Sequence, residues 1–439
     1  MRKNKAVVAL VMLIMISAAA FSQATTNSPY SKYGIGIIRP QTFPQNFAMG
    51  GTAIGIRSDR DIGFLNPASY SALVVTTFDV GFVSNNLWLK DDNQSQYKNN
   101  PYITHLSFGV PVVKNHWGMS FGILPYSNTG YAYDEIVDDP IAGNVSFYNE
   151  GAGAINKVYF GNGFAARIDT NTNVSFGANV HYLFGSISHD QKAIFGDLPG
   201  GFNIWKLRDF SASDVGADLG MQFQKTFRDT SGNRNRKYVF TLGATYGLSA
   251  DVKGTTTTLT RTFTGNIDFG TIKDTVEYIE DEETIIQLPS EFGVGMSLDY
   301  TGDESKWLFA ADYKSGNWGS VLSEDSLFTY RNNFGISAGA QFIPDYGSTK
   351  YLGLIAYRLG FRYSTSYLTI NNTDFSEYGI TFGVGLPIKR SENTYPRFNI
   401  GMEYGSRGTK DNGLIKENFL NFNVGITINA VWFQKRKYD

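Results

Sequence analysis

Apolar and polar residues alternate along residues 420–433, LNFNVGITINAVWF, close to the end of the chain. One set of alternate positions is apolar: Leu420, Phe422, Val424, Ile426, Ile428, Ala430 and Trp432. The positions between them carry mainly Asn, Gly and Thr. Because successive strand side chains point to opposite faces, this pattern predicts a β-strand with one apolar and one polar face. The strand is longer than the roughly five or six residues usual in globular proteins.

The same alternation recurs along the chain and predicts about fourteen strands, many near the length of about 9–11 residues that a tilted strand needs to cross a bilayer. The predicted strands are 78–82, 106–112, 117–123, 155–168, 174–184, 215–227, 238–248, 292–300, 307–313, 334–342, 351–363, 378–388, 398–404 and 420–432.

Connection lengths distinguish a membrane barrel from a β-sandwich. Long connections, among them 84–101, 125–154 and 251–287, alternate with short ones such as 114–116 and 301–305. Outer-membrane barrels have short periplasmic turns and long extracellular loops, whereas a sandwich has no reason to alternate. The sequence therefore predicts an all-β fold, with residues 73–439 forming a transmembrane antiparallel β-barrel. An even strand number places both termini in the periplasm.

Two segments precede the predicted barrel. Residues 1–22 combine a basic start, an apolar stretch at 6–16 and small residues before position 23, as in a secretory signal peptide. Residues 23–72 lack long alternation and are rich in Pro and Gly, which predicts compact irregular structure. They are too apolar for a disordered tail, so we expect them to form a plug inside the barrel.

Composition excludes several functional classes. The chain has no Cys and a formal net charge of −2, so thiol chemistry is excluded and charge-driven nucleic-acid binding is not expected. Its four histidines show no HExxH or similarly tight metal-ligand spacing. No GxSxG, P-loop or dinucleotide-binding motif is present. We therefore predict neither an enzyme nor a cofactor or metal site; outer-membrane lipid is the expected surrounding.

Charged side chains on the predicted inward faces are candidate lumen residues: Arg358, Arg362, Glu403 and Asp312. They are consistent with a selectivity constriction, or with an anchor for a ligand carboxylate through guanidinium bonds. The alternative, which we favour, is a salt-bridge network that holds strands and plug together, because buried charges are normally paired.

Short motifs resemble a known family. "AMGGTAIG" (48–55) followed by "DIGFLNPASYSAL" (61–73) resembles the FadL-type long-chain fatty-acid transporters of the outer membrane. The resemblance implies an N-terminal hatch that plugs the lumen, with Gly50, Gly51, Asn66, Pro67 and Ala68 as its motif residues. The opening "SPYSKYGIG" (28–36) and the closing "EYGSRGT" and "WFQKRKYD" are similar to Bacteroidetes members, including PorV-like proteins of the type IX secretion system.

Two hypotheses for the function follow from the resemblance. The leading one is passive transport of hydrophobic, fatty-acid-like small molecules across the outer membrane. The alternative is a non-transporting scaffold or adaptor barrel of a secretion or outer-membrane assembly complex, with other proteins of that complex as partners. An apolar pocket open to the exterior would favour transport, and a lumen sealed by charged residues would favour the scaffold.

The predicted topology can be tested by labelling single cysteines introduced into this Cys-free background. We expect residues within 84–101, 125–154 and 251–287 to react with a membrane-impermeant maleimide on intact cells. Residues within 228–237 should react only after the outer membrane is permeabilised. Labelling of 228–237 on intact cells together with protection of 251–287 would invert the topology.

Overall fold

The structure is a computed structural model that describes residues 26–92, 94–196, 201–229, 236–267, 270–321, 327–388 and 394–432. The predicted signal peptide and the closing basic residues lie outside the described residues.

Strands dominate the structure, and the helices are short. Before the barrel lie η1 (Pro29–Lys32), β1 (Ile37–Ile38), α2 (Pro44–Phe47) and η2 (Pro67–Ala72). Then follow β2 (Thr76–Lys90), β3 (Ser95–Val113), β4 (Trp117–Asp139), β5 (Gly143–Asp169), β6 (Thr172–Phe195), β7 (Asn203–Asp229), β8 (Arg236–Gly247), β9 (Ala250–Thr264), β10 (Thr271–Leu288), β11 (Glu291–Thr301), β12 (Lys306–Gly316), η3 (Trp318–Ser320), β13 (Phe328–Tyr330), β14 (Asn333–Ile343), α3 (Tyr351–Leu354), β15 (Ala356–Ile370), β16 (Thr373–Pro387), β17 (Thr394–Arg407), η4 (Asp411–Gly413) and β18 (Lys416–Ala430). No helix among the described residues is long and apolar enough to span a bilayer.

The strands close into an antiparallel barrel with fourteen positions, which confirms the predicted fold class. Closure is made by β18 and β2, which pair along their whole length, with Ile426 opposite Val80. Strands β8 and β9 share one position, because β7 pairs with β8 through its second half and with β9 through its first half. Strands β10 and β11 share the next position in the barrel, because β10 pairs with β9 and β11 pairs with β8.

The faces of the strands are as the alternation predicts. In β18, Phe422 and Ile426 are exposed on the outside, whereas Asn423 and Thr427 are buried inside. The outer apolar face suits lipid contact, and closure leaves no unpaired edge along this part of the wall. Aromatic side chains line the turn end of the wall: the Trp307 ring centroid lies 4.1 Å from that of Phe342, and Tyr238 lies 4.9 Å from Tyr300.

Three connections expected to be long loops are instead hairpins that extend the barrel strands. Residues 84–101 lie mostly in β2 and β3, residues 125–154 in β4 and β5, and residues 251–287 mostly in β9 and β10. The expectation failed because these extensions no longer carry an apolar outer face, and that face was the pattern used to recognise strands. At the opposite end, residues 351–354, predicted to begin a strand, form α3 instead.

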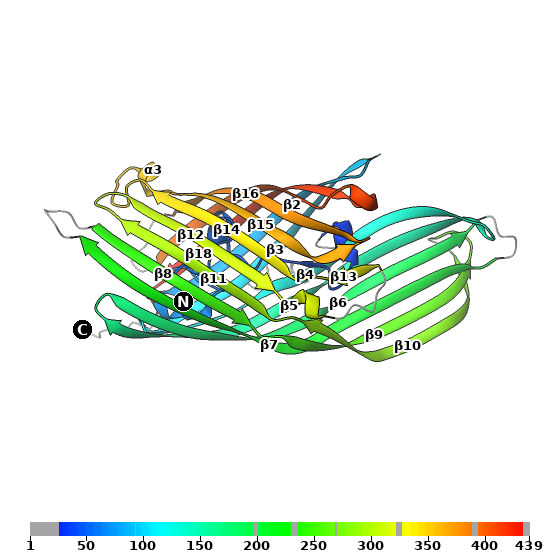
Figure 1. The fold of residues 1–439 in the computed structure, drawn as a ribbon, viewed down its shortest axis with the longest axis horizontal. Helices are drawn as coiled ribbons and strands as arrows, with labels where there is room; N and C mark the ends of the chain where they lie inside the picture. The colour runs from blue at the N-terminus through cyan, green and yellow to red at the C-terminus, as the bar shows by residue number, and fades with distance from the viewer. Residues whose placement is uncertain are drawn as a thin grey trace, which may run out of the picture.

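The hairpins make the wall uneven in height. Figure 1 shows β5, β6, β7, β9 and β10 reaching far beyond the rest of the barrel at one end, while the end with α3 carries short turns. We call these extensions the curtain, and the end of the barrel that carries them its upper end; the curtain comprises residues 126–155 of β4 and β5, 185–195 of β6, 203–212 of β7, 250–264 of β9 and 271–288 of β10.

The outward apolar face generates a stability prediction. Ile426→Arg places a charge on the outer wall and should destabilise the barrel by about 2–4 kcal/mol if the side chain lies near the bilayer midplane. Ile136→Arg is the matched control, because Ile136 is 71% exposed on the β4–β5 hairpin, away from the apolar wall. Urea unfolding in lipid vesicles measures both variants. Equal losses of stability would contradict the assigned lipid face.

Candidate functional site

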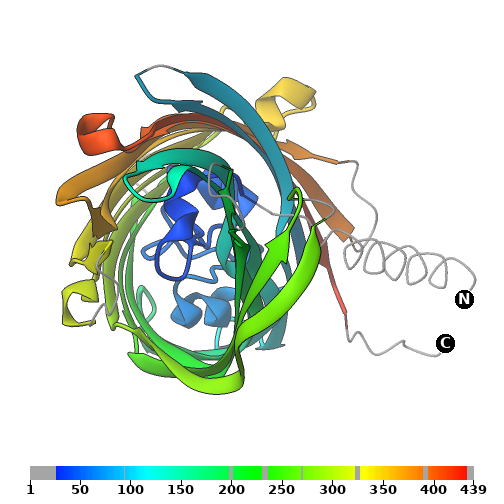
Figure 2. The ribbon, with the colours of Figure 1, turned by 90° about the vertical axis from the view of Figure 1, so that its right-hand side faces the viewer.

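Residues 26–75, which we call the inner segment, lie inside the barrel. Figure 2 looks along the barrel and shows this segment, in blue, within the ring of strands. Most of its side chains are buried, including Ile54, Asn66 and Tyr70. The barrel lumen is therefore the candidate functional site, and the inner segment is its principal occupant.

The wall meets the inner segment at inward-facing glycines on twelve barrel strands, and we call a set of twelve, one taken from each strand, the glycine belt. At each of them an added Cβ would lie within 3.0 Å of an atom of the inner segment. The belt comprises Gly109, Gly118, Gly163, Gly177, Gly220, Gly243, Gly295, Gly339, Gly360, Gly383, Gly401 and Gly425. Much of the high glycine content thus serves close approach between two backbones.

Four of the five predicted motif residues, Gly50, Asn66, Pro67 and Ala68, lie within this contact, whereas a Cβ on Gly51 would meet only Thr42 of the inner segment itself. Gly50 has a φ of +71° and Gly51 one of +85°, a region that residues with a Cβ rarely adopt. The Gly50 amide also donates a hydrogen bond to Thr381 Oγ1 at 2.9 Å. Gly50 could not be replaced easily, because a Cβ there would lie 2.5 Å from the carbonyl oxygen of Phe361.

Asn66 ties the inner segment together and to the wall. Its Oδ1 accepts a hydrogen bond from the amide of Ala68 at 3.2 Å and so caps η2, which begins at Pro67. Its Nδ2 donates to the carbonyl oxygens of Ile54 at 2.9 Å and Met221 at 3.1 Å.

Arg57, which sequence reasoning did not single out, is a second such tie. Its guanidinium donates to Ser71 Oγ at 2.9 Å and to Ser175 Oγ at 2.8 Å, and no carboxylate pairs with it among the described residues. Burial lowers the pKa of Arg57 to about 10. The group therefore remains charged at neutral pH and holds the segment against the wall through neutral acceptors.

The four predicted lumen charges do not form one site. Asp312 accepts hydrogen bonds from the amides of Ala53 at 2.7 Å and Ile54 at 3.0 Å, so it anchors the inner segment. Arg362 and Glu403 form an ion pair with each other. Arg358 lies apart from that pair and interacts with neutral amides.

Arg358 begins a row of polar side chains across the wall. It donates to Gln341 Oε1 at 2.7 Å and to Asn399 Oδ1 at 2.8 Å. The row continues from Asn399 to Thr427 at 3.1 Å and from Thr427 to Asp79 Oδ2 at 2.7 Å, and His105 Nε2 lies 2.8 Å from Asp79 Oδ1. The ring of Phe43, from the inner segment, stacks on His105 at 3.8 Å between centroids.

Arg362 and Glu403 belong to a larger ion cluster in the upper lumen. Arg362 also pairs with Glu377, which in turn pairs with Arg407, and Arg407 lies 3.5 Å from Glu417. Ser28 of the inner segment donates to Glu417. We call Arg362, Glu377, Glu403, Arg407 and Glu417, together with Arg39, the ion cluster.

The ion cluster contains as many acidic as basic groups, and all six border one cavity. Arg39 contributes a third cation through its electrostatic interaction with Glu377 and Glu417. Three guanidinium groups therefore lie among three carboxyl groups, which reduces the number of buried charges without a partner. Burial lowers the pKa of Arg39.

Glu377, Arg407 and Glu417 were missed by sequence reasoning. They lie at or beyond the ends of the predicted strands 378–388, 398–404 and 420–432, whereas the real strands β16, β17 and β18 continue past these residues. Following the alternation into the polar extensions would have placed all three side chains on the inner face.

Cavities around the inner segment are small. One of about 230 Å³ lies among Ile37, Trp318, Tyr367, Arg362 and Glu377. A second, of about 170 Å³, is bordered by Pro40, Phe47, Lys314 and Glu403, and a third of about 50 Å³ lies beside Arg39 and Tyr102. Each of the three has both apolar and charged walls, and Arg362 borders all of them.

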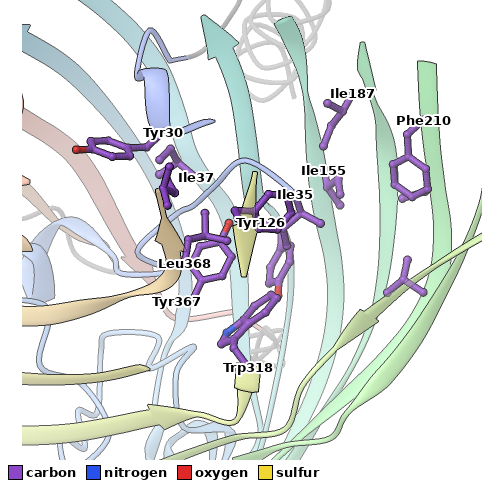
Figure 3. Close-up of a cluster of buried hydrophobic side chains, with 14 of the residues drawn as sticks. Tyr30, Ile35, Ile37, Tyr126, Ile155, Ile187, Phe210, Trp318, Tyr367 and Leu368 are labelled. Atoms are coloured by element: carbon purple, nitrogen blue, oxygen red, sulfur yellow. The ribbon is translucent and has the colours of Figure 1, made fainter. Parts of the chain in front are cut away.

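An apolar cluster fills the space below the curtain. Figure 3 shows Ile35 and Ile37 of the inner segment with Tyr126 of the wall and Trp318 after β12. Wall residues on successive strands continue the cluster: Ile155, Leu183, Ile187, Phe210 and Val252. The cluster buries the base of the curtain against the inner segment, so this apolar surface is already covered.

The wall splits between β3 and β4. The two strands pair only between Leu106–Val113 and Trp117–Ile123, and β4 has an irregularity between Pro125 and Ser127. Above the split, β1 of the inner segment pairs with β4, with Ile38 opposite Ser127. Arg39 adds a backbone bond to Tyr126 and places its guanidinium over the ring of Tyr102 at 4.4 Å. The inner segment therefore covers the β4 edge of the opening.

Among the described residues, no group of three or more His, Cys, Asp or Glu side chains lies close enough together to hold a metal ion.

Comparison with solved structures identifies the fold. The P. putida toluene transporter TodX superposes with a TM-score of 0.56 at 16% identity, covering 92% of this chain and 100% of the other. The Ralstonia pickettii toluene transporter TbuX gives 0.55 at 17% identity, covering 88% and 98%. A Pseudomonas aeruginosa FadL homologue gives 0.53 at 11% identity, covering 91% and 100%. The chain thus has the barrel fold of FadL-type hydrocarbon transporters.

Sequence comparison adds a family. The BamG family model matches residues 1–439, the whole chain. None of the curated proteins matches it.

The glycine belt generates a prediction with a control on the same strand. At Gly339 of β14 a Cβ would lie 2.3 Å from the carbonyl oxygen of Met49, whereas at Gly335 the nearest atom would be 3.5 Å away. Gly339→Ala should cost about 1–3 kcal/mol by overpacking, and Gly335→Ala should cost much less. Denaturant unfolding, with protease cleavage of the inner segment as a second readout, measures both. Equal stability of the two variants would show that the inner segment does not press against the belt.

Proposed function

This chain belongs to the BamG family, and we propose that it is a non-transporting scaffold or adaptor barrel of a secretion or outer-membrane assembly complex. The observation that carries the proposal is the filled lumen: the inner segment is packed against twelve strands and bonded to the ion cluster.

Cavity size supports this proposal over transport. Pockets that hold small molecules usually measure about 300–1,000 Å³ and are mostly apolar. The three lumen cavities described above, of about 230, 170 and 50 Å³, are smaller, and each borders charged side chains.

Charge balance also argues against capture of a fatty-acid carboxylate. Arg362 and Arg407 would have to release Glu377, Glu403 or Glu417 in order to bind a ligand carboxylate. Removing one partner from a buried pair leaves a charge uncompensated, which typically costs about 3–5 kcal/mol. The ion cluster is better suited to holding the inner segment and β15–β18 in place.

The proposal also states where the protein lies and what each part of the chain does. Residues 1–22 would direct export, the barrel would lie in the outer membrane, and both termini would face the periplasm. Residues 23–72 would act as a permanent plug rather than a moving hatch. PorV-like barrels, which the terminal motifs resemble, would be the functional analogues, and proteins of the complex would be the partners.

Passive transport of hydrophobic molecules is the second candidate, and one observation favours it. The split between β3 and β4, at the irregular Pro125–Ser127 stretch, is where a ligand could leave sideways. For this to happen, β1 and Arg39 would have to detach from β4. Transport therefore requires the inner segment to move, whereas the adaptor function requires it to stay.

Uptake and conductance distinguish the two functions. The purified protein, reconstituted in liposomes, should not accelerate entry of a fluorescent long-chain fatty acid above empty liposomes, and it should not conduct ions in a planar bilayer. From native membranes, the tagged protein should be extracted within a complex larger than its own 48.6 kDa.

A variant lacking residues 28–66 provides the control, because it removes no barrel strand and should conduct if it assembles. Faster fatty-acid entry with the parent protein would overturn the adaptor function and restore transport. Extraction of the parent only as a single chain would also count against it.

A further inference from the structure

One edge of the curtain has no partner. Strand β10 pairs with β9 from Thr271 to Leu288, and no described residue pairs with its other side. The barrel wall next to β10 does not reach as high as β10 itself, because β12 ends at Gly316. Just after the end of β12, the amide of Asn317 donates a hydrogen bond to the carbonyl oxygen of Ser290, and the wall beside β10 ends at this height.

Both faces of β10 are also uncovered, so the strand is neither core nor lipid wall. Val276, Tyr278 and Ile285 are 64%, 57% and 61% exposed. Only the residues nearest the barrel, such as Ile286 and Leu288, pack against the apolar cluster. Long edge strands with exposed apolar side chains are rare on proteins that work alone, because free backbone groups recruit other strands.

The charge of β10 restricts what could pair with it. Its sequence, TIKDTVEYIEDEETIIQL, contains six carboxylates and one lysine. A second copy of this chain would bring equal negative charge against the same edge, which disfavours self-pairing. An anionic lipid surface is disfavoured for the same reason.

The backbone of β10 is suitable for pairing over part of its length. Register irregularities fall between Ile272 and Asp274, Thr275 and Glu277, and Ile279 and Glu282. Such bulges protect an edge where they occur. The stretch from Glu282 to Leu288 is free of them and follows β9 residue by residue, so it can offer its free groups to another strand.

We infer that the free edge of β10, centred on residues 282–287, is a docking strand for an extended, lysine- or arginine-rich segment of another protein outside the cell. The segment would add as the next strand of the curtain. Backbone hydrogen bonds would supply affinity, and the carboxylates at 280–283 would select basic sequences. The biological meaning of this site rests on the proposed adaptor function.

The test uses synthetic peptides and the full-length protein in nanodiscs of phosphatidylcholine. A ten-residue peptide of alternating lysine and valine should bind, by fluorescence anisotropy, and should slow amide exchange in β10. Two further peptides should bind at least about tenfold more weakly: one with glutamate in place of lysine, and one N-methylated at alternate residues. N-methylation keeps the charge but blocks strand pairing.

A charge-reversal variant and its matched control locate the site. Glu280→Lys, Glu282→Lys and Glu283→Lys combined should weaken binding at least about tenfold. Asp134→Lys, Glu135→Lys and Asp138→Lys combined make the same charge change at exposed positions on the β4–β5 hairpin and should leave binding unchanged.

Equal binding of the N-methylated peptide, or equal loss in both triple variants, would reduce the contact to nonspecific charge attraction and overturn the inference. Failure of the lysine–valine peptide to bind would overturn it directly. These outcomes are independent of the uptake assay: fatty-acid transport would refute the adaptor function without affecting peptide binding.

Discussion

Contact between the backbone of the inner segment and the glycine belt is the constraint on which the rest of the structure depends. Glycine weakens a strand, because it has no side chain to pack and loses more entropy on folding. Twelve barrel strands nevertheless carry one at the level of the inner segment. At Gly118 an added Cβ would lie only 1.9 Å from the carbonyl oxygen of Tyr70. The wall is therefore shaped for an occupied lumen.

The close fit determines where charge can be placed. The inner segment leaves carbonyl and amide groups facing the wall, and Asp312 and Gln222 of the wall bond to them directly. Above the belt, the ion cluster joins Ser28 of the inner segment to strands β15–β18. Backbone packing holds the lower part of the segment and paired charges hold its upper part.

The sequence predicted those parts of the fold that contact lipid, and failed where lipid contact ends. Alternation placed Ile426 outside and Thr427 inside correctly, because a bilayer demands one continuous apolar face. The curtain has no such face, so β9 and β10 were taken for a loop. Arg362 and Glu403 were recognised because they lie within predicted strands, whereas their partners Glu377 and Arg407 lie at or beyond the predicted ends. The sequence pattern did not reveal the glycine belt, because an inward-facing glycine fits the alternation equally well whether it faces water or another backbone.

The hydrogen-bonding groups of the inner segment and those of β10 differ in whether they have partners. Inside, the capping bonds of Asn66 and the pairing of β1 with β4 use groups that would otherwise be free to bind a ligand. Outside, β10 keeps one side of its backbone unpaired and its apolar side chains exposed. A transporter would be expected to show the reverse, with binding capacity in the lumen and a protected exterior. Under the proposed adaptor function, this unpaired edge outside the barrel is the place at which the protein would recognise a partner.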